Sequence, residues 1–247
     1  MRRDRAFRLG PELFLFERVF EDCLERIALT GRHFESALMI GCPDPGWPAR
    51  LHACARQVEV RDPGPLFAAA AGGEAIVEDA WAPEPQRYDL ILALGTLDSV
   101  NALPLALRLV RHAMRPDGLF IGAMSGGETL PQLRNAMRAA DAVGGVAAPH
   151  IHPRIEASAL SPLLSEAGFD MPVVDIERLE VSYASFLKLV RDLRGMSATN
   201  ILCAKPPALD RRGFRAAREA FAKAANGQRT TETFEILHFA AWTAPDS

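Results

Sequence analysis

One turn in the sequence has residue types that could hold a ligand. The apolar run 37–40 continues directly into Gly41, and Pro43 and Pro45 follow in the same turn. A glycine directly after a strand lets the backbone approach a ligand, and a helix over 47–55 would direct its N-terminus at polar or anionic groups. Each proline removes an N–H donor and fixes φ. The pattern predicts either a cradle for a nucleotide-type cofactor or an ordinary strand-to-helix turn.

Acidic residues follow the next two apolar runs, where they could accept hydrogen bonds from a ligand. Asp62 follows the run 58–60, and a carboxylate there can accept from ribose hydroxyls. Asp-Pro-Gly is also a common turn sequence, so a simple turn is the alternative. Glu78 and Asp79 follow the run 75–77, where a carboxylate could accept from an adenine amino group or lie in a solvated turn. As a surface ligand residue, Asp62 is expected to contribute little to stability.

Polar residues also follow the fourth apolar run. Residues 90–94 end at Leu94, and Asp98 and Asn101 come soon after. In an open parallel sheet, ligands bind at the carboxyl ends of the strands, where the strand order reverses. Asp98 is therefore placed for binding, whereas Asp89 opens the run, lies at the opposite end and is predicted to be structural.

The elements that must position these residues alternate along the chain. Short apolar runs bounded by turns are typical of strands buried on both faces, and their alternation with helices predicts a parallel sheet with helices on both sides. The predicted strands are 37–40, 58–60, 75–77, 90–94 and 119–123, followed by extended segments at 172–176, 180–183 and 233–243. The predicted helices are 11–29, 47–55, 65–71, 103–114, 130–143, 158–167 with Ser158 as N-cap, 185–194 and 210–225.

Composition excludes several classes of protein. The 247 residues are 49% hydrophobic and 24% charged, and the formal net charge of −3 gives no overall attraction to nucleic acid. The 4 cysteines show no metal-ligand spacing, which predicts free thiols in a reducing compartment and a cytoplasmic protein. No stretch approaches the length of a membrane span. The oligomeric state is not indicated.

A longer stretch of the sequence resembles a known family. The segments that carry the likeness are Tyr88 to Ile91, Val100 with Ala102 and Leu103, and Met114 to Phe120 with its Arg115-Pro116-Asp117-Gly118 turn. They closely resemble the fourth strand, the following helix and the fifth strand of class I S-adenosylmethionine-dependent methyltransferases. The turn looks like the family's Pro-Gly-Gly turn before the fifth strand.

The downstream part resembles one branch of that family. It contains the methyltransferase-like assembly factors of respiratory complex I and is related to the malonyl-carrier-protein methyltransferase of biotin synthesis. The matching segments are 121–124, 126–130, 149–153 and 163–169, then Tyr183, Leu193, Gly195, Met196, Asn200 and 234–242. The resemblance covers about residues 10–243. It implies one α/β domain over 1–247: a seven-stranded, mostly parallel Rossmann-like sheet with helices on both faces and an antiparallel last strand. Residues 1–30 would form a helical segment, and 125–160 would cover the active site.

The resemblance also implies a cofactor and its site. S-adenosylmethionine would lie against Gly41 and Asp62, which are retained at positions matching the family. The other candidates for binding it are Cys42, Asp79, Ala80 and Leu94. Asp98, Glu128 and Arg154 are our own candidates for binding the methyl acceptor. The chain departs from the family at Met39, where an acidic residue is expected, and at Pro43 and Pro45, where glycines are expected. These departures should weaken the binding of S-adenosylmethionine by about 1–3 kcal/mol, or roughly tenfold to a hundredfold.

Methyl transfer from a sulfonium is an in-line displacement, so the protein mainly orients donor and acceptor. A base is needed only if the acceptor is protonated, and His150, His152 and Tyr183 are the candidates. A carboxylate acceptor could be held by Arg154 in a bidentate pair, and no base would then be needed. The alternative for both histidines is an ordinary solvent-facing loop.

The predicted function is therefore an S-adenosylmethionine-dependent methyltransferase acting on a small acid or a protein side chain. The alternative is a methyltransferase-fold assembly factor acting on a respiratory-complex protein, by hydroxylation or as a non-catalytic scaffold. Hydroxylation would need oxygen chemistry, for which His150, His152 and Glu156 form a weak candidate iron triad. Otherwise no metal site is predicted.

Overall fold

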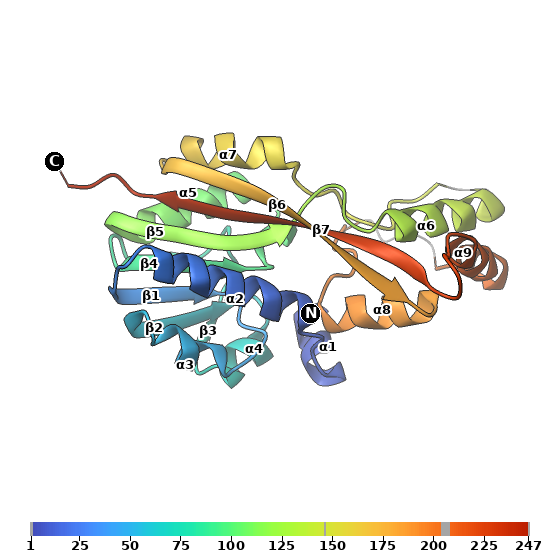
Figure 1. Cartoon of the computed structure of the whole chain (residues 1–247), viewed down its shortest axis with the longest axis horizontal. Coiled ribbons are helices and arrows are strands. Elements are labelled where there is room, and N and C mark those ends of the chain that lie inside the picture. The colour runs from blue at the N-terminus through green and yellow to red at the C-terminus, as the bar shows by residue number, and fades with distance from the viewer. Residues whose placement is uncertain (1, 146, 204–207, 247) are drawn as a thin grey trace.

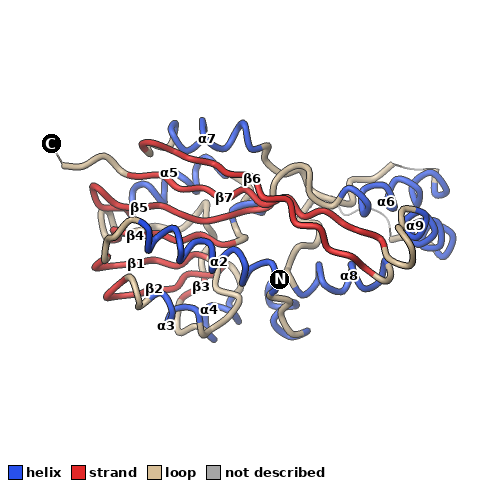
Figure 2. Tube along the Cα trace, viewed as in Figure 1, coloured by secondary structure: helices blue, strands red, loops and turns tan. Residues whose placement is uncertain are grey.

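A seven-stranded sheet forms the centre of the molecule (Figures 1 and 2). The computed structural model describes residues 2–145, 147–203 and 208–246. The strands are β1 (Phe34–Ile40), β2 (Ala55–Asp62), β3 (Glu74–Ala75), β4 (Tyr88–Leu94), β5 (Met114–Ser125), β6 (Asp170–Tyr183) and β7 (Thr230–Trp242). Their order is β3-β2-β1-β4-β5-β7-β6; β1 to β5 pair in parallel, and β7 is antiparallel to both neighbours. The predicted α/β fold and its antiparallel last strand are confirmed.

Helices cover both faces of this sheet. They are α1 (Arg2–Leu9), α2 (Phe14–Leu29), α3 (Trp47–Leu51), α4 (Pro65–Ala70), the 3₁₀ turn η1 (Leu97–Ser99), α5 (Leu103–Ala113), α6 (Pro131–Gly144), α7 (Ala157–Glu166), α8 (Phe186–Gly195) and α9 (Arg211–Lys223). No helix in the described ranges is both long and apolar enough to cross a membrane.

The side chains of the central strands alternate between two cores, as the period of a strand requires. In β1, Ala37 and Met39 lie in the core under α2 and α3, while Leu38 and Ile40 lie in the core under α5 and α7. All four are completely buried or nearly so. This burial on both faces is why the strands read as continuous apolar runs.

The last two strands extend beyond the rest of the sheet as a two-stranded ribbon. β5 pairs with β7 only from Ile236 onward, whereas β6 pairs with β7 as far as Tyr183 and Thr230. The helices α6, α8 and α9 gather around this extension (Figure 1). Together they enclose a third core, which includes Phe186 and Phe221. We call this part of the molecule the distal lobe.

Several predicted boundaries were wrong for identifiable reasons. The segments 172–176 and 180–183 are one strand, because Glu177 and Arg178 between them continue the ladder and pair with Arg18 and Glu235. The helix predicted over 47–55 ends at Leu51, since Ala55 already pairs in β2.

The start of α7 and the first helix also differ from prediction. Glu156, not Ser158, is the N-cap residue of α7. The periodicity predicted a helix over 11–29 alone, and α1 was covered only by the helical segment expected over residues 1–30; it is rich in arginine and buries only Arg3 and Ala6.

Candidate functional site

The loops after β1 and β4 meet at the carboxyl edge of the sheet, as predicted for Gly41 and Leu94. Gly41 has φ of 86°, and a Cβ there would overlap the Leu94 carbonyl oxygen and lie 2.6 Å from Cγ2 of Thr96. Only glycine fits this close approach. The glycine is therefore required by contact between two loops of the chain.

Cys42 follows in the same loop and is buried. Its Sγ lies 3.1 Å from the Asp44 carbonyl oxygen. Burial, with the nearby carboxylates of Asp62 and Asp44, raises the pKa of the Cys42 thiol to about 12. The thiol is thus protonated at neutral pH, and its contribution to a ligand would come from the backbone of the loop.

Asp62 joins this loop to the end of β2 and is completely buried. Its Oδ2 accepts from the backbone N–H of Cys42 at 2.8 Å, and its Oδ1 accepts from that of Gly64 at 2.6 Å. Arg3 donates from Nε to Oδ1 at 2.7 Å and from a terminal nitrogen to Oδ2. The expectation of a surface residue is wrong. The carboxylate has the predicted position, and a guanidinium of the same chain lies where ribose hydroxyls were expected.

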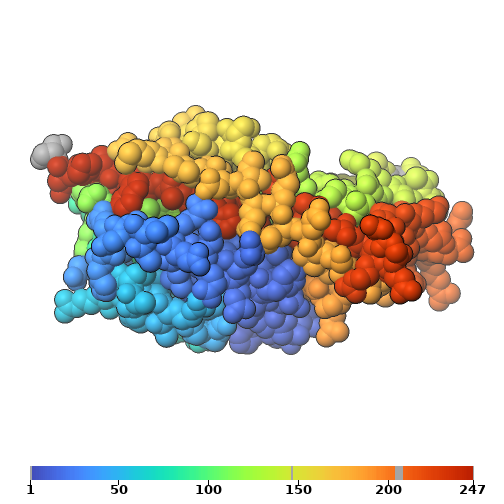
Figure 3. Space-filling view, in the orientation of Figure 1, coloured from blue at the N-terminus to red at the C-terminus, as the bar shows by residue number. Residues whose placement is uncertain are grey.

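The helix that carries Arg3 lies between α4 and α8 (Figures 1 and 3). On one side, the Arg3 guanidinium lies 5.0 Å from the centre of the Phe67 ring, which Phe7 also contacts edge to face. Asp4 accepts from the backbone N–H of Leu66 at 3.2 Å. On the other side, Arg2 donates to the Ser197 carbonyl oxygen at 2.9 Å. Helix α1 therefore joins the loop after β2 to the end of α8.

The acidic residues after β3 also lie at this edge. Asp79 accepts from the backbone N–H of Ala102 at 2.9 Å, which attaches it to the start of α5. Ala80 donates its N–H to the Val77 carbonyl at 2.9 Å. Glu78 is buried, and this burial raises the pKa of its carboxyl group. Carboxylates from β2 and β3 thus come together at one end of the sheet.

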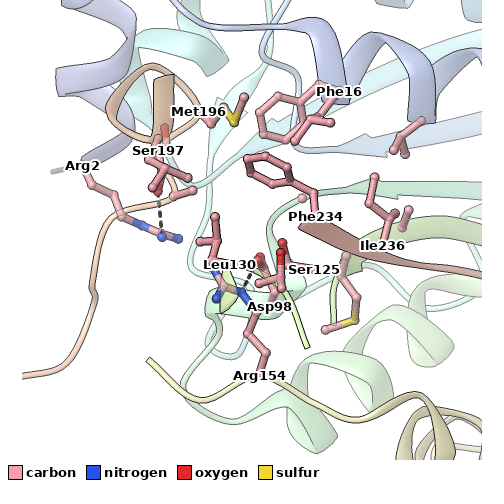
Figure 4. Close-up of a pocket in the computed structure, with 18 residues that line it drawn as sticks. Arg2, Phe16, Asp98, Ser125, Leu130, Arg154, Met196, Ser197, Phe234 and Ile236 are labelled. Carbon is pink, nitrogen blue, oxygen red and sulfur yellow. Dashed lines mark hydrogen bonds and ion pairs between the residues drawn. The ribbon is translucent and has the colours of Figure 1, made fainter. Parts of the chain in front are cut away.

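Beside these loops lies a small cavity of about 70 Å³ (Figure 4). Its wall is mostly apolar, with Phe16, Met196, Phe234 and Ile236 around it. Its polar members are Arg2, Asp98, Ser125, Thr129, Arg154 and Ser197. We call it the central cavity.

Arg154 and Asp98 face each other in the central cavity, as Figure 4 shows. The Arg154 side chain is 1% exposed, and its Nε lies 3.7 Å from Oδ2 of Asp98. Within the described residues, its Nε and Nη1 have no hydrogen-bond partner. Burial lowers the pKa of Arg154, and the Asp98 carboxylate opposes that effect. A buried guanidinium with two unpaired donors is suited to bind a carboxylate.

The two predicted histidines lie in a different cavity, of about 310 Å³, between α6, α8 and α9. His150 Nε2 lies 2.7 Å from Oδ1 of Asp141. His152 is buried, and its Nε2 has no hydrogen-bond partner in the described part of the chain. Burial and the charge of Arg154 lower the pKa of His152 to about 4. His152 is therefore neutral at pH 7 and a weak base.

The two cavities adjoin. Both are lined by Leu130, Leu193 and Ala198. Leu130 has φ of 61° and ψ of 47°, a left-handed conformation that is uncommon for leucine and often associated with functional sites. We call the larger space the lobe cavity.

Two predicted site residues lie elsewhere. Tyr183 is packed in the core of the distal lobe, where burial raises the pKa of its hydroxyl well above the ordinary value. Glu128 is two-thirds exposed and lies 3.0 Å from Arg178 on the surface. Neither lines the central cavity. The sequence also missed Arg3 and Arg2, since nothing in their local pattern indicates a partner near residue 62 or 197.

The weak iron-triad candidate is not assembled. In the described ranges no three His, Cys, Asp or Glu side chains form a group that could hold a metal ion. The Glu156 carboxylate packs on Gly127, while His150 pairs with Asp141.

No model of a known protein family matches the sequence. The mitochondrial arginine-hydroxylase NDUFAF5 of Danio rerio is 38% identical over 164 residues, which are 65% of this chain and 51% of that protein. The malonyl-[acyl-carrier protein] O-methyltransferase of Xylella fastidiosa is 33% identical over 161 residues, or 64% of this chain and 52% of that protein. The chain spans about half the length of these curated relatives.

A solved structure with the same fold is the Haemonchus contortus phosphoethanolamine N-methyltransferase 2, in complex with phosphomonomethylethanolamine and S-adenosylhomocysteine. The TM-score is 0.53 at 13% identity, and the match covers 91% of this chain and 52% of that one. At this identity the likeness concerns the fold alone.

Proposed function

The chain has the fold of the class I S-adenosylmethionine-dependent methyltransferases and is related in sequence to the two groups of proteins above; from this premise we propose that it methylates a carboxylate. The observation that carries the proposal is the buried, incompletely paired guanidinium of Arg154 in the central cavity. Such a group favours an anionic partner more strongly than a neutral one.

The residues at the edge of the sheet fit an adenosyl cofactor in type and position. Asp62 and Asp79 supply carboxylates after β2 and β3, suited to ribose hydroxyls and an adenine amino group. Gly41 keeps the β1 loop tightly against the β4 loop. When bound, S-adenosylmethionine supplies a methyl group on a sulfonium for displacement by a nucleophile.

The acceptor would be held by Arg154. A carboxylate beside a buried guanidinium stays ionised, because the opposite charge lowers its pKa. An ionised carboxylate oxygen is already a nucleophile and needs no general base. The weak basicity of His152 and the distant position of Tyr183 are then compatible with turnover. Arg154 thus binds and orients the acceptor, and the apolar wall excludes water.

The lobe cavity gives room for the remainder of the acceptor. Its wall includes Leu133, Met137, Phe186 and Phe214, so it suits an apolar body. It adjoins the central cavity at Leu130, so an acceptor entering from there would bring its acidic end toward Arg154. We therefore expect a carboxylic acid with an apolar chain or ring.

One observation supports the alternative function, that of a scaffold or hydroxylase. Asp62 is already satisfied by Arg3, which is what a protein that retains the fold without binding the cofactor would show. A relative named as a mitochondrial arginine-hydroxylase is compatible with a protein partner. The alternative is thus a scaffold or hydroxylase acting on a respiratory-complex protein. For the methyltransferase function we also propose the cytoplasmic location that was predicted from the cysteines.

Transfer of a radiolabelled methyl group from S-adenosylmethionine to a panel of carboxylic acids and matched amines tests the proposal. We expect base-labile methyl esters of apolar acids. Arg154→Gln should abolish transfer, whereas Arg178→Gln, which removes an arginine outside the central cavity, should retain it. Methylation of the amines but not the acids would show that the acceptor class is wrong. Absence of S-adenosylhomocysteine binding at millimolar concentration in every variant would favour the scaffold.

A further inference from the structure

We infer that Arg3 is an internal competitor for the cofactor site, so that an adenosyl group binds only when helix α1 leaves Asp62. This inference rests on the proposed function, because it assumes that the edge of the sheet is the cofactor site. It concerns how tightly and in what order ligands bind there, which neither the fold nor the relatives indicate.

The first argument is the saturation of Asp62. Its two oxygens already accept from two backbone N–H groups, those of Cys42 and Gly64, and from two nitrogens of Arg3. A planar guanidinium on a carboxylate is the strongest of the common side-chain pairs. Ribose hydroxyls can reach this carboxylate only by replacing Arg3, since the backbone donors belong to the loops that form the site.

The second argument is space. A Cβ on Gly64 would lie 2.7 Å from Cβ of Arg3, so the first helix packs directly on the loop after β2. The central cavity holds about 70 Å³, far below the roughly 300–1,000 Å³ usual for small-molecule pockets. With α1 in place, this volume is too small for a methionine arm beside the acidic end of an acceptor.

The third argument is that α1 is short and that most of its side chains are not buried. It has 8 residues, of which only Arg3 and Ala6 are buried; isolated helices below about 12–15 residues are marginal in water. Gly10 follows it with φ of 86°, and no described atom outside its chain neighbours lies within 4 Å of the position that a Cβ would occupy there. This glycine can absorb a change of backbone direction. Helix α1 can therefore swing about Gly10 while α2 keeps its place on the sheet.

The two neighbouring arginines couple the cofactor site to the acceptor site. Arg3 holds Asp62, while Arg2 holds the Ser197 carbonyl and forms part of the wall of the central cavity. When α1 leaves, the contact of Arg3 with Asp62 and the contact of Arg2 with the Ser197 carbonyl are lost together. Cofactor binding thus opens the wall near Arg154, and the acceptor should bind after the cofactor.

Calorimetric titration with S-adenosylhomocysteine tests the inference without measuring activity. We expect Arg3→Gln to bind at least tenfold more tightly than the wild type, and Arg3→Lys to lie between them, because an ammonium makes fewer bonds to the carboxylate. Arg5→Gln is the matched control: it makes the same charge change on an exposed position of the same helix and should leave affinity unchanged.

Limited trypsin digestion gives an independent readout, since exposed Arg5 and Arg8 lie within α1. Adding S-adenosylhomocysteine should accelerate cleavage after them in the wild type, and Arg3→Gln should be cleaved fast without ligand. Equal affinity of wild type and Arg3→Gln, with unchanged cleavage, would overturn the competitor role while leaving the cofactor site intact. Failure of both proteins to bind would overturn the cofactor site itself. Far-ultraviolet circular dichroism checks that each variant is folded.

Discussion

The guanidinium of Arg3 forms a two-point ion pair with the carboxylate of Asp62, 59 positions further along the chain. Both side chains are almost entirely excluded from water. The pair joins the first helix to the end of β2, directly beside the loop that begins at Gly41. The same contact therefore bears on stability and on ligand binding.

Asp62→Asn should destabilise the protein markedly, contrary to what a surface position would imply. The substitution leaves the Arg3 guanidinium buried without its counter-charge, which costs about 3–5 kcal/mol for a buried pair. Urea unfolding should show the loss. The double variant Arg3→Gln with Asp62→Asn should recover part of it, because no buried charge is then left over. Strictly additive single effects in this cycle would mean that the pair contributes no coupling energy.

Gly41→Ala should lower the free energy of unfolding by at least about 2 kcal/mol more than Gly72→Ala. Both glycines have positive φ, which costs an alanine about 1–2 kcal/mol, but only at Gly41 does the new Cβ meet the Leu94 carbonyl and Thr96. Gly72 has nothing within 4 Å of that position. Thermal and urea unfolding of the two variants measure the difference. Equal losses would show that the loop after β1 can move away from β4.

His152 should make the protein less stable in weak acid. Its pKa of about 4 in the folded state lies below the ordinary value near 6.5, so the unfolded chain binds the extra proton first as the pH falls. The contribution of neutral His152 to the free energy of unfolding is therefore fully present above about pH 6.5. It is lost on acidification toward pH 4, by up to roughly 3 kcal/mol. His152→Gln should reduce the difference between urea midpoints at pH 7.5 and pH 5. His33→Gln, an exposed control, should leave that difference unchanged.

Arg154→Met should leave the free energy of unfolding unchanged or raise it by about 1 kcal/mol, while eliminating carboxylate binding. A buried arginine with two unpaired donors and a counter-ion 3.7 Å away loses more by desolvation than it regains. Methionine fills similar space without that loss. Chemical denaturation, with a titration of the best acid found in the transfer assay, separates the two effects. A large loss of stability would mean that Arg154 is structural.

The central strands of the sheet follow from short-range patterns that the sequence shows directly. The buried run before Gly41 and the run ending at Leu94 are apolar on both faces, and only a sheet covered by helices on both sides hides them. Asp62 was placed correctly at the end of β2 because its position depends on the strand alone. Arg154 and Asp98 were each predicted to bind the acceptor, and the structure brings them together.

What the sequence did not show depends on distant contacts. Helix α1 has few apolar residues, so its pattern predicts no packing, and Arg3 finds its partner only after the sheet has formed. Tyr183 lies next to a predicted helix and a polar segment, yet the ribbon carries it into the distal core. His150 and His152 were alternative candidates for a base; both line the lobe cavity, where His150 pairs with Asp141 and His152 is buried.

The ribbon formed by β6 and β7 has a mechanical consequence. Phe234 belongs to the core of the distal lobe and Leu237 to the core of the sheet, although only three positions separate them on one strand. Because one continuous strand is shared by the two cores, neither core can unfold alone without breaking hydrogen bonds between β6 and β7. The lobe and the sheet should therefore unfold as one cooperative unit, and a ligand that tightens the lobe cavity would also stiffen the sheet.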